Sequence, residues 1–233
     1  MIFGISDKEK TILLERINKA KSVPAPENSL GQWIGYIVDD GTSVMLEEIV
    51  GELRKQSGRN FDAIPKKGEK SIRLKNTLGQ DKQIDHAIKE DKVLRLIVET
   101  KWLKDQRHLN DKGSWILMMG DILLENKNLK GVVCVLAGPW ESMRTVIEKR
   151  AEAVIIPTQT VYDLLNKNKI NIPLDLSRNA YKDPEGSLLK LLKEVERSAE
   201  DGIDFCRKIG YELLCNYKND LKNKIQKLLL KNT

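Results

Sequence analysis

The stretch that most constrains the fold covers residues 83–102, QIDHAIKEDKVLRLIVETKW, and has the pattern of two β-strands joined by a tight connection. In its first half apolar and polar side chains alternate, which is typical of a half-buried strand. Its second half, residues 93–98, is apolar and partly β-branched apart from Arg95, as expected for a largely buried strand. The pattern predicts a β-hairpin within a small sheet.

Three charged residues interrupt this apolar pattern. Asp85 falls in the predicted first strand, whereas Glu99 and Lys101 follow the buried part of the second, on one face of an extended chain. Two carboxylates on adjacent strands suit Mg²⁺, which binds through one or two carboxylates together with water and substrate phosphate. A lysine beside them could orient or deprotonate the attacking water. The residue types indicate phosphodiester hydrolysis, and the alternative interpretation is a surface salt bridge.

The charge balance is compatible with an anionic partner such as nucleic acid. The 233 residues include 40 Lys and Arg against 34 Asp and Glu, a formal net charge of +6. A basic run before the hairpin could follow a phosphate backbone, with a solvated loop as the alternative. This run contains Lys66, Lys67, Lys70, Arg73 and Lys75. Side chains of the types that contact bases follow the hairpin at Arg107, Asn110 and Lys112.

The cysteine, histidine and hydropathy patterns exclude several kinds of protein. The three cysteines form no CxxC pair, which argues against a disulfide framework or a zinc site and favours a reduced cytoplasm. His86 and His108 lack the spacing of paired metal ligands. No signal core is recognisable, and no apolar run approaches the roughly 20 residues that span a bilayer. We therefore expect a soluble, cytoplasmic protein without a membrane partner.

Helical patterns precede the hairpin. Residues 6–21 have helical spacing, and a loop containing Gly31 and Gly35 is expected after them. A second helix is expected over residues 43–58, with a capping hydroxyl at its start and a glycine at its end. Residues 60–80 have the composition of a loop or an irregular strand.

Three glutamates of the second predicted helix are candidates for the neighbourhood of the hairpin. Glu47 and Glu52 flank the apolar face of this helix, whereas Glu48 points away from it. Glu47 is therefore the carboxylate best placed near a buried neighbour. The alternative is that all three are solvated surface charges.

Helices and strands alternate after the hairpin. The pattern predicts a helix over 111–124, a strand over 131–137, a short helix over 142–149, a strand over 153–156 and a helix over 158–165. This order implies crossover connections and parallel strands attached to the antiparallel hairpin. The sequence thus predicts an α/β fold with a central mixed β-sheet flanked by helices.

The C-terminal part of the sequence is helical in pattern. We expect a main domain over residues 1–185 and a helical extension over 186–233. Within the extension, residues 198–230 have the apolar spacing of one long helix. This helix packs on the core or forms a dimer arm, and the sequence leaves both open.

An acidic residue on one strand, a hairpin and an acidic-x-Lys motif at the end of an apolar strand resemble the PD-(D/E)xK nucleases, in particular the type II restriction endonucleases. The motif here is Asp85 followed by Glu99-Thr100-Lys101, and the resemblance covers about residues 44–165. It implies a restriction-endonuclease-like fold in which Asp85 and Glu99 hold Mg²⁺. It further implies that the Thr100 carbonyl helps to hold the metal and that Lys101 serves the attacking water.

Other acidic residues are alternative candidates for metal binding. The resemblance implies that Glu47 occupies the acidic position that some members carry on the first helix, with the two other glutamates of that helix as alternatives. Asp62 and Asp81 compete with Asp85 for the first acidic role, but neither lies in a strand pattern. Ile84 stands where the family often has proline, at a position where the family varies.

The sequence therefore predicts a Mg²⁺-dependent, site-specific endonuclease of restriction type that cuts double-stranded DNA as a homodimer. In such a dimer each subunit would cut one strand of a palindromic site. The alternatives are a DNA-repair or recombination nuclease of the same fold, and a DNA-binding protein without catalytic activity.

Overall fold

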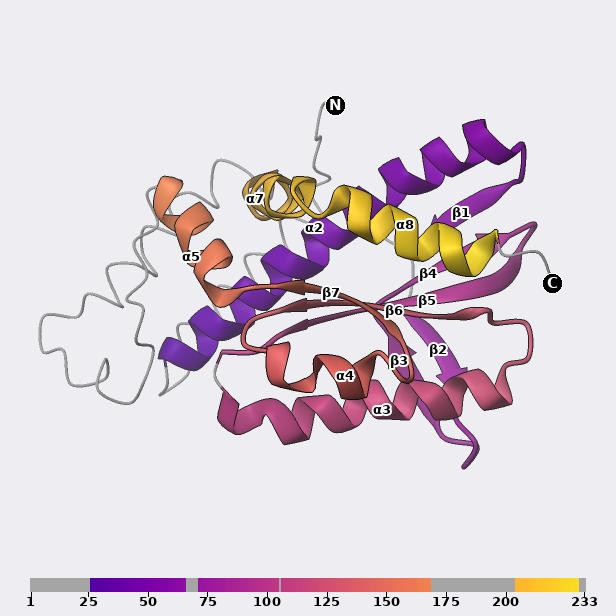
Figure 1. Cartoon of the computed structure of the whole chain (residues 1–233), viewed down its shortest axis with the longest axis horizontal. Coiled ribbons are helices and arrows are strands. Elements are labelled where there is room, and N and C mark those ends of the chain that lie inside the picture. The colour runs from indigo at the N-terminus through magenta and orange to yellow at the C-terminus, as the bar shows by residue number, and fades with distance from the viewer. Residues whose placement is uncertain (1–25, 66–70, 105, 169–203, 231–233) are drawn as a thin grey trace, which may run out of the picture.

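The computed structural model describes residues 26–65, 71–104, 106–168 and 204–230, and its centre is a five-stranded sheet of order β1-β4-β5-β6-β7 (Figure 1). The strands are β1 (Phe61–Ile64), β4 (His86–Glu90), β5 (Val93–Trp102), β6 (Gly131–Ala137) and β7 (Glu152–Ile156). β1, β4 and β5 are antiparallel neighbours, whereas β5, β6 and β7 run parallel. The predicted mixed sheet is confirmed. The helix expected over residues 6–21 lies outside the described residues.

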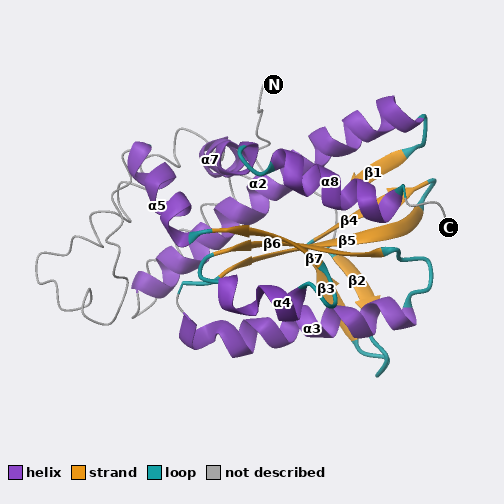
Figure 2. Cartoon of the chain, viewed as in Figure 1, coloured by secondary structure: helices purple, strands orange, loops and turns teal. Residues whose placement is uncertain are grey.

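Helices cover both faces of this sheet (Figure 2). The first face carries α2 (Pro26–Ser57), α5 (Thr158–Lys167), α7 (Asp204–Cys215) and α8 (Lys218–Leu229). The second carries α3 (Leu109–Glu125), α4 (Arg144–Ile147) and a two-stranded ribbon of β2 (Ile72–Lys75) and β3 (Asp81–Ile84). Alternate residues of β5 point to opposite faces of the sheet, so that Leu96 and Val98 belong to the first core and Ile97 belongs to the second. The predicted α/β architecture therefore has two apolar layers around one sheet.

The predicted hairpin corresponds to β4 and β5. Asp91 and Lys92 connect them, and both have positive φ angles, of 47° and 72°. Two left-handed residues in succession are typical of the tight turns whose twist matches that of the flanking strands. His86 pairs with Val98 near the far end of the hairpin. This pairing brings the residue before β4 close to the carboxyl end of β5.

Asp85 differs from its expected setting, because it lies at a bend between β3 and β4 rather than within a strand. β3 pairs with β2 in a separate sheet, whereas β4 belongs to the central one. The chain leaves one sheet and enters the other at this residue. Residues 60–80, expected as a loop or irregular strand, include the regular strands β1 and β2.

The elements after the hairpin follow the prediction closely. Predicted residues 111–124 correspond to α3, 131–137 to β6, 153–156 to β7 and 158–165 to α5. The short helix expected over 142–149 is a 3₁₀ turn, η2 (Glu141–Met143), followed by the single turn of α4. The apolar strands are predictable here because they are buried on both faces.

α2 is longer than predicted, because it begins at Pro26 and includes the segment expected as a loop. Gly31 and Gly35 lie inside this helix, and Cβ atoms built on them would be 3.9 Å and 3.8 Å from atoms of Trp102. The glycines therefore form the surface of α2 on which the indole packs. Tertiary packing outweighs their low helix propensity.

The C-terminal helical pattern contains a break that was not predicted. Residues expected as part of one helix form α7 and α8, which are separated at Asn216 and Tyr217. α7 packs against α2, and α8 lies across β5, β6 and β7. The apolar side chains of both helices belong to the first core, including Leu213 and Ile225. In the part of the chain that the structure describes, no helix combines the length and apolar character needed to cross a membrane.

The contact between α2 and α7 depends on two glycines. A Cβ atom on Gly41 would overlap the backbone of Gly210, and a Cβ atom on Gly210 would overlap the carbonyl oxygen of Ile37. The obstructing atoms belong to backbone, so they cannot move aside as a flexible side chain would. The two helices therefore approach as closely as their backbones allow.

We predict that Gly210→Ala lowers the free energy of unfolding by about 1–3 kcal/mol, the usual cost of overpacking a closed core. Gly51→Ala on α2 is the control, because no atom lies within 4 Å of a Cβ atom at that position. It should raise the free energy of unfolding by about 0.5–1 kcal/mol through helix propensity. Urea denaturation followed by circular dichroism measures both, and equal effects would contradict the close helix contact.

Candidate active site

Asp85, Glu99 and Lys101 meet at the carboxyl end of β5. The Lys101 ammonium donates hydrogen bonds to Asp85 Oδ2 at 2.8 Å and to Glu99 Oε1 at 2.6 Å. Glu99 and Lys101 share one face of β5, and Asp85 approaches from the bend before β4. The structure thus brings together the three residues that the sequence pattern singled out.

Thr100 completes the surroundings of the ammonium. Its carbonyl oxygen accepts a third hydrogen bond from Lys101 Nζ at 2.9 Å. Its backbone N–H donates to Asp85 Oδ2 at 3.0 Å, which holds the carboxylate against β5. Lys101 Nζ therefore lies among three oxygen atoms, two from carboxylates and one from the backbone.

Glu99 is the deeply buried member of the group, with 0% of its side chain exposed. Trp115 of α3 donates its indole N–H to Glu99 Oε1 at 2.6 Å, and the backbone N–H of Asp85 donates to Oε2 at 3.4 Å. Burial raises the pKa of Glu99, and the Asp85 charge adds to this effect while the Lys101 charge opposes it. The net pKa lies above the usual value.

The pKa of Lys101 is also set by opposing effects of burial and neighbouring charge. Burial alone would lower its pKa, but the charges of Glu99 and Asp85 outweigh that effect and raise it. Lys101 is therefore present as an ammonium ion, the positive counterpart of two adjacent carboxylates. Removing one partner from a buried ion pair typically costs about 3–5 kcal/mol, because the remaining charge is left uncompensated.

A fourth charged residue, Asp39 of α2, reaches the same place from the opposite face of the sheet. Its Oδ1 atom is 2.8 Å from His86 Nε2 and accepts a hydrogen bond from the Thr100 hydroxyl at 2.8 Å. The same hydroxyl lies 3.2 Å from Asp85 Oδ2, and its single proton can serve one carboxylate at a time. Thr100 therefore connects Asp39 to Asp85.

The pKa values of Asp39 and His86 depend on each other. Burial raises the pKa of Asp39, but the hydrogen bond and charge of His86 outweigh it and the net pKa is lowered. Burial lowers the pKa of His86, but the hydrogen bond and charge of Asp39 outweigh it and the net pKa is raised. Both shifts favour a charged pair.

The glutamates expected near the site lie elsewhere. Glu47 lines a separate pocket with Arg54 and Asp62, two turns further along α2 than Asp39. Glu48 accepts hydrogen bonds from Tyr211 and Lys218, and Glu52 accepts them from Lys218 and Lys222. The helix carboxylate at the site is thus Asp39, which the sequence missed because its segment was expected to be a loop.

The two competing aspartates also lie away from Lys101. Asp62 is on β1 and pairs with Arg54 at 2.8 Å. Asp81 is the first residue of β3, is exposed, and lies opposite Lys75 in the ribbon. The structure does not bring either side chain into the group formed by Asp85 and Glu99.

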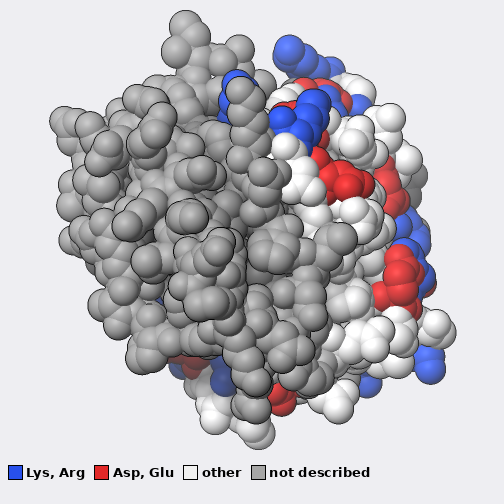
Figure 3. Space-filling view, turned by 90° about the vertical axis from the view of Figure 1, so that its left-hand side faces the viewer, with Lys and Arg blue, Asp and Glu red and all other residues white. Residues whose placement is uncertain are grey.

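The predicted DNA-contacting residues are scattered in the structure. Lys66, Lys67 and Lys70 lie outside the described residues. Arg73 and Lys75 are exposed on β2, Arg107 belongs to the 3₁₀ turn η1 (Gln106–His108), and Asn110 is exposed at the start of α3. Lys112 donates to the Trp102 carbonyl at 2.7 Å and is the predicted contact nearest the site. On the face seen in Figure 3, described basic and acidic side chains are interspersed.

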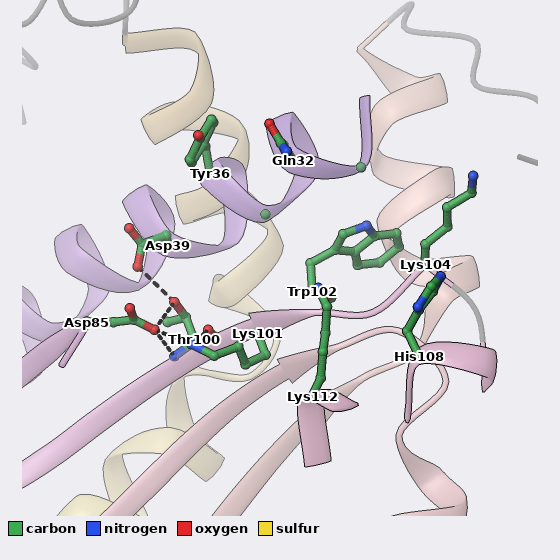
Figure 4. Close-up of a pocket in the computed structure, with 12 residues that line it drawn as sticks. Gln32, Tyr36, Asp39, Asp85, Thr100, Lys101, Trp102, Lys104, His108 and Lys112 are labelled. Atoms are coloured by element: carbon green, nitrogen blue, oxygen red, sulfur yellow. Dashed lines mark hydrogen bonds and ion pairs between the residues drawn. The ribbon is translucent and has the colours of Figure 1, made fainter. Parts of the chain in front are cut away.

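A pocket of about 510 Å³ opens beside the charged group (Figure 4). Asp39, Asp85, Thr100 and Lys101 line one part of it. The remainder is lined by Gly31, Gln32, Gly35, Tyr36, Trp102, Lys104, His108 and Lys112. Asp85 and Lys101 are therefore accessible to a ligand of moderate size, with Glu99 buried behind them.

The possible ligands for a cation are oxygen atoms. Among the described residues, no group of three or more His, Cys, Asp or Glu side chains is placed to hold a metal ion. The site instead combines two carboxylates with the Thr100 carbonyl, and the Lys101 ammonium is the positive group that they surround. Oxygen donors of this kind suit Mg²⁺ or Ca²⁺ better than a softer transition metal.

Comparison with known proteins found no relative of this chain. No protein-family model matches the chain, and neither the curated proteins nor the solved structures contain a significant match. The geometry of the site is therefore the guide to the function of the chain.

We predict that the interaction between Asp39 and His86 stabilises the fold most at mildly acidic pH. The raised pKa of His86 adds stability below its ordinary value of 6.5, and this is lost as the pH rises through the raised value. The lowered pKa of Asp39 adds stability above its ordinary value of 3.8, and this is lost as the pH falls through the lowered value. The stabilisation is thus largest between these two ordinary values.

A double-mutant cycle with Asp39→Asn and His86→Gln, measured by urea denaturation in EDTA, tests this pair. At about pH 5.5 we expect a coupling energy of about 1 kcal/mol, reduced from that of a fully buried pair because 40% of the Asp39 side chain is exposed. The coupling should become smaller as the pH rises through the raised pKa of His86, because the imidazole then loses its charge. A coupling energy independent of pH would contradict the charged pair.

Proposed function

We propose that the protein is a metal-dependent endonuclease that hydrolyses phosphodiester bonds in double-stranded DNA, with the fold and site plan of the PD-(D/E)xK nucleases. The observation that carries this proposal is the set of three oxygens around Lys101 Nζ, at 2.6–2.9 Å. Asp85, Glu99 and the Thr100 carbonyl are the groups that the motif assigns to metal binding. Their convergence on one positive group supports that assignment.

The donor set fits a Mg²⁺ ion. The Lys101 ammonium stands in for a cation, since it is surrounded by the oxygens that would hold the ion. When bound, Mg²⁺ would supply Lewis acidity and lower the pKa of a coordinated water. Because Mg²⁺ keeps several waters and binds through few carboxylates, two carboxylates and one carbonyl are a sufficient protein contribution.

The residues of the chain have separate roles in this proposal. Asp85 and Glu99 bind the ion, and the Trp115 indole N–H fixes the orientation of the Glu99 carboxylate. As an ammonium, Lys101 stabilises the negative charge that develops on the phosphate and orients the attacking water. Burial of Glu99 strengthens these electrostatic interactions, because few water molecules screen them.

Asp39 replaces Glu47 as the acidic residue contributed by the first described helix. It holds the Thr100 hydroxyl and His86, and it lies in the pocket beside Asp85. We assign it a positioning role, in which it orients Thr100 and through it the Asp85 carboxylate.

We further propose that the enzyme is of restriction type and acts as a homodimer. The net charge of +6 supports an anionic substrate. A two-fold symmetric dimer would place one site on each strand and read a palindromic sequence.

We predict that the wild type cleaves a mixture of plasmid DNAs in Mg²⁺ and is inactive in EDTA. Lys101→Ala, Asp85→Asn and Glu99→Gln should each lower the cleavage rate at least about 100-fold, because each removes a group that acts on the metal or the phosphate. Asp39→Asn should lower it about 10-fold to 100-fold, as expected for a group that orients a metal ligand. Gel analysis of plasmid nicking and linearisation measures these rates.

Glu47→Gln is the matched control for Asp39→Asn, because it makes a similar charge change on the same helix and should leave the rate within about twofold. Thermal denaturation of each variant separates loss of folding from loss of chemistry. Discrete fragments favour sequence-specific cutting, whereas cutting restricted to supercoiled or branched DNA favours a repair or recombination nuclease. Equal cleavage by wild type and a folded Lys101→Ala variant, or no cleavage by wild type, would overturn the proposal.

A further inference from the structure

The pocket beside the candidate active site extends well beyond the residues that the proposed hydrolysis requires. Asp39, Asp85 and Lys101 occupy only one part of its lining. The other part lies between the first turns of α2 and the segment that connects β5 to α3 (Figure 4). Its total size, about 510 Å³, falls in the range of pockets that enclose a small organic ligand.

The two parts of the pocket differ in charge. Carboxylates surround Lys101 in the first part, whereas Lys104, His108 and Lys112 line the second. Figure 4 shows the side chains of Lys104 and His108 on the side of Trp102 away from Asp39 and Asp85. Consecutive phosphates of a nucleic-acid strand are separated by one nucleoside. A strand with one phosphate at the metal ligands would therefore carry a neighbouring phosphate toward this basic part.

An aromatic ring lies between these two parts. Figure 4 shows Trp102 between the side chains of Asp39 and Asp85 and those of Lys104 and His108, and Gln32 and Tyr36 of α2 also line the pocket. Aromatic rings are sequence-tolerant partners for nucleobases, and an amide side chain can hydrogen-bond a base edge. The lining thus offers the types of contact that a nucleoside needs.

Trp102 provides a second observation that points to a ligand. The residue is only 4% exposed, and its indole N–H has no hydrogen-bond partner among the described residues. A buried donor without a partner destabilises the state in which it is left unsatisfied. The indole nitrogen lies beside Gly31, at 3.9 Å from the position that a Cβ atom on this glycine would occupy. A carbonyl oxygen of a ligand in the pocket could satisfy this donor after a small movement of the indole.

We propose that the second part of the pocket is a subsite for one nucleotide next to the scissile phosphate. Lys104, with His108 beside it, binds the neighbouring phosphate, and Trp102 and Gln32 contact the nucleoside. The subsite rests on the proposed phosphodiesterase function, because that function places a strand in the pocket. It adds the residues that hold the nucleotide next to the scissile phosphate.

Titration of ¹⁵N-labelled protein with thymidine 3′,5′-bisphosphate in EDTA tests the subsite without metal or cleavage. The readout is the indole N–H resonance of Trp102, identified among the four tryptophans with Trp102→Phe. We expect a saturable shift of this resonance. Lys104→Ala should weaken the Kd about tenfold, the loss expected for one charge-assisted contact.

Lys127→Ala is the matched control, because Lys127 is exposed in the turn before β6, at the opposite end of the parallel strands. It should leave the Kd unchanged. Thymidine alone and inorganic phosphate alone should each bind at least about tenfold more weakly than the bisphosphate, since each makes only part of the contacts. Both compounds therefore test whether the nucleoside and the phosphates are recognised together.

Three results would overturn the subsite: no saturable shift at millimolar bisphosphate, equal weakening by Lys104→Ala and Lys127→Ala, or equal binding of inorganic phosphate and the bisphosphate. Failure here with intact Mg²⁺-dependent cleavage would remove the subsite and leave the nuclease function in place. Specific bisphosphate binding without any cleavage would retain a nucleotide site and remove the nuclease function.

Discussion

The ion cluster formed by Lys101, Asp85 and Glu99 is the interaction on which the site depends. Glu99 is fully buried, and burying a carboxylate is costly unless a positive charge and hydrogen bonds compensate it. Lys101 supplies the charge, and Trp115 supplies one of the hydrogen bonds. The cluster therefore holds two carboxylates close together. The same closeness makes their oxygens suitable for a divalent cation.

The fold brings these groups together through two features of the chain. The bend between β3 and β4 frees Asp85 from strand alternation, and the pairing of His86 with Val98 places that bend beside the end of β5. α2 then passes across the other face of the sheet and brings Asp39 to Thr100. The close contact of α2 with α7, through Gly41 and Gly210, anchors this helix on the sheet. The site thus joins both faces of the sheet at the carboxyl end of β5.

The sequence predicted the features that depend on strong local patterns. The buried strands β5, β6 and β7 and the pair Glu99 and Lys101 follow from apolar runs and from strand alternation. The start of α2 could not be predicted in this way, because Gly31 and Gly35 are typical of loops. Their place in a helix is explained only by the packing of Trp102 against them. Asp39 was missed for the same reason. The break between α7 and α8 has no proline or glycine to signal it, and it reflects the different surfaces on which the two helices pack.

If the oxygens around Lys101 Nζ form a cation site, a divalent ion should bind among them. Anomalous diffraction from crystals soaked in Mn²⁺, an ion that prefers oxygen ligands as Mg²⁺ does, tests it directly. We expect an anomalous peak within coordination distance of Asp85, Glu99 and the Thr100 carbonyl, with the Lys101 ammonium displaced from its place among them. A Lys101 ammonium still bound to both carboxylates, with no peak at this position at saturating Mn²⁺, would show that these oxygens do not form a cation site.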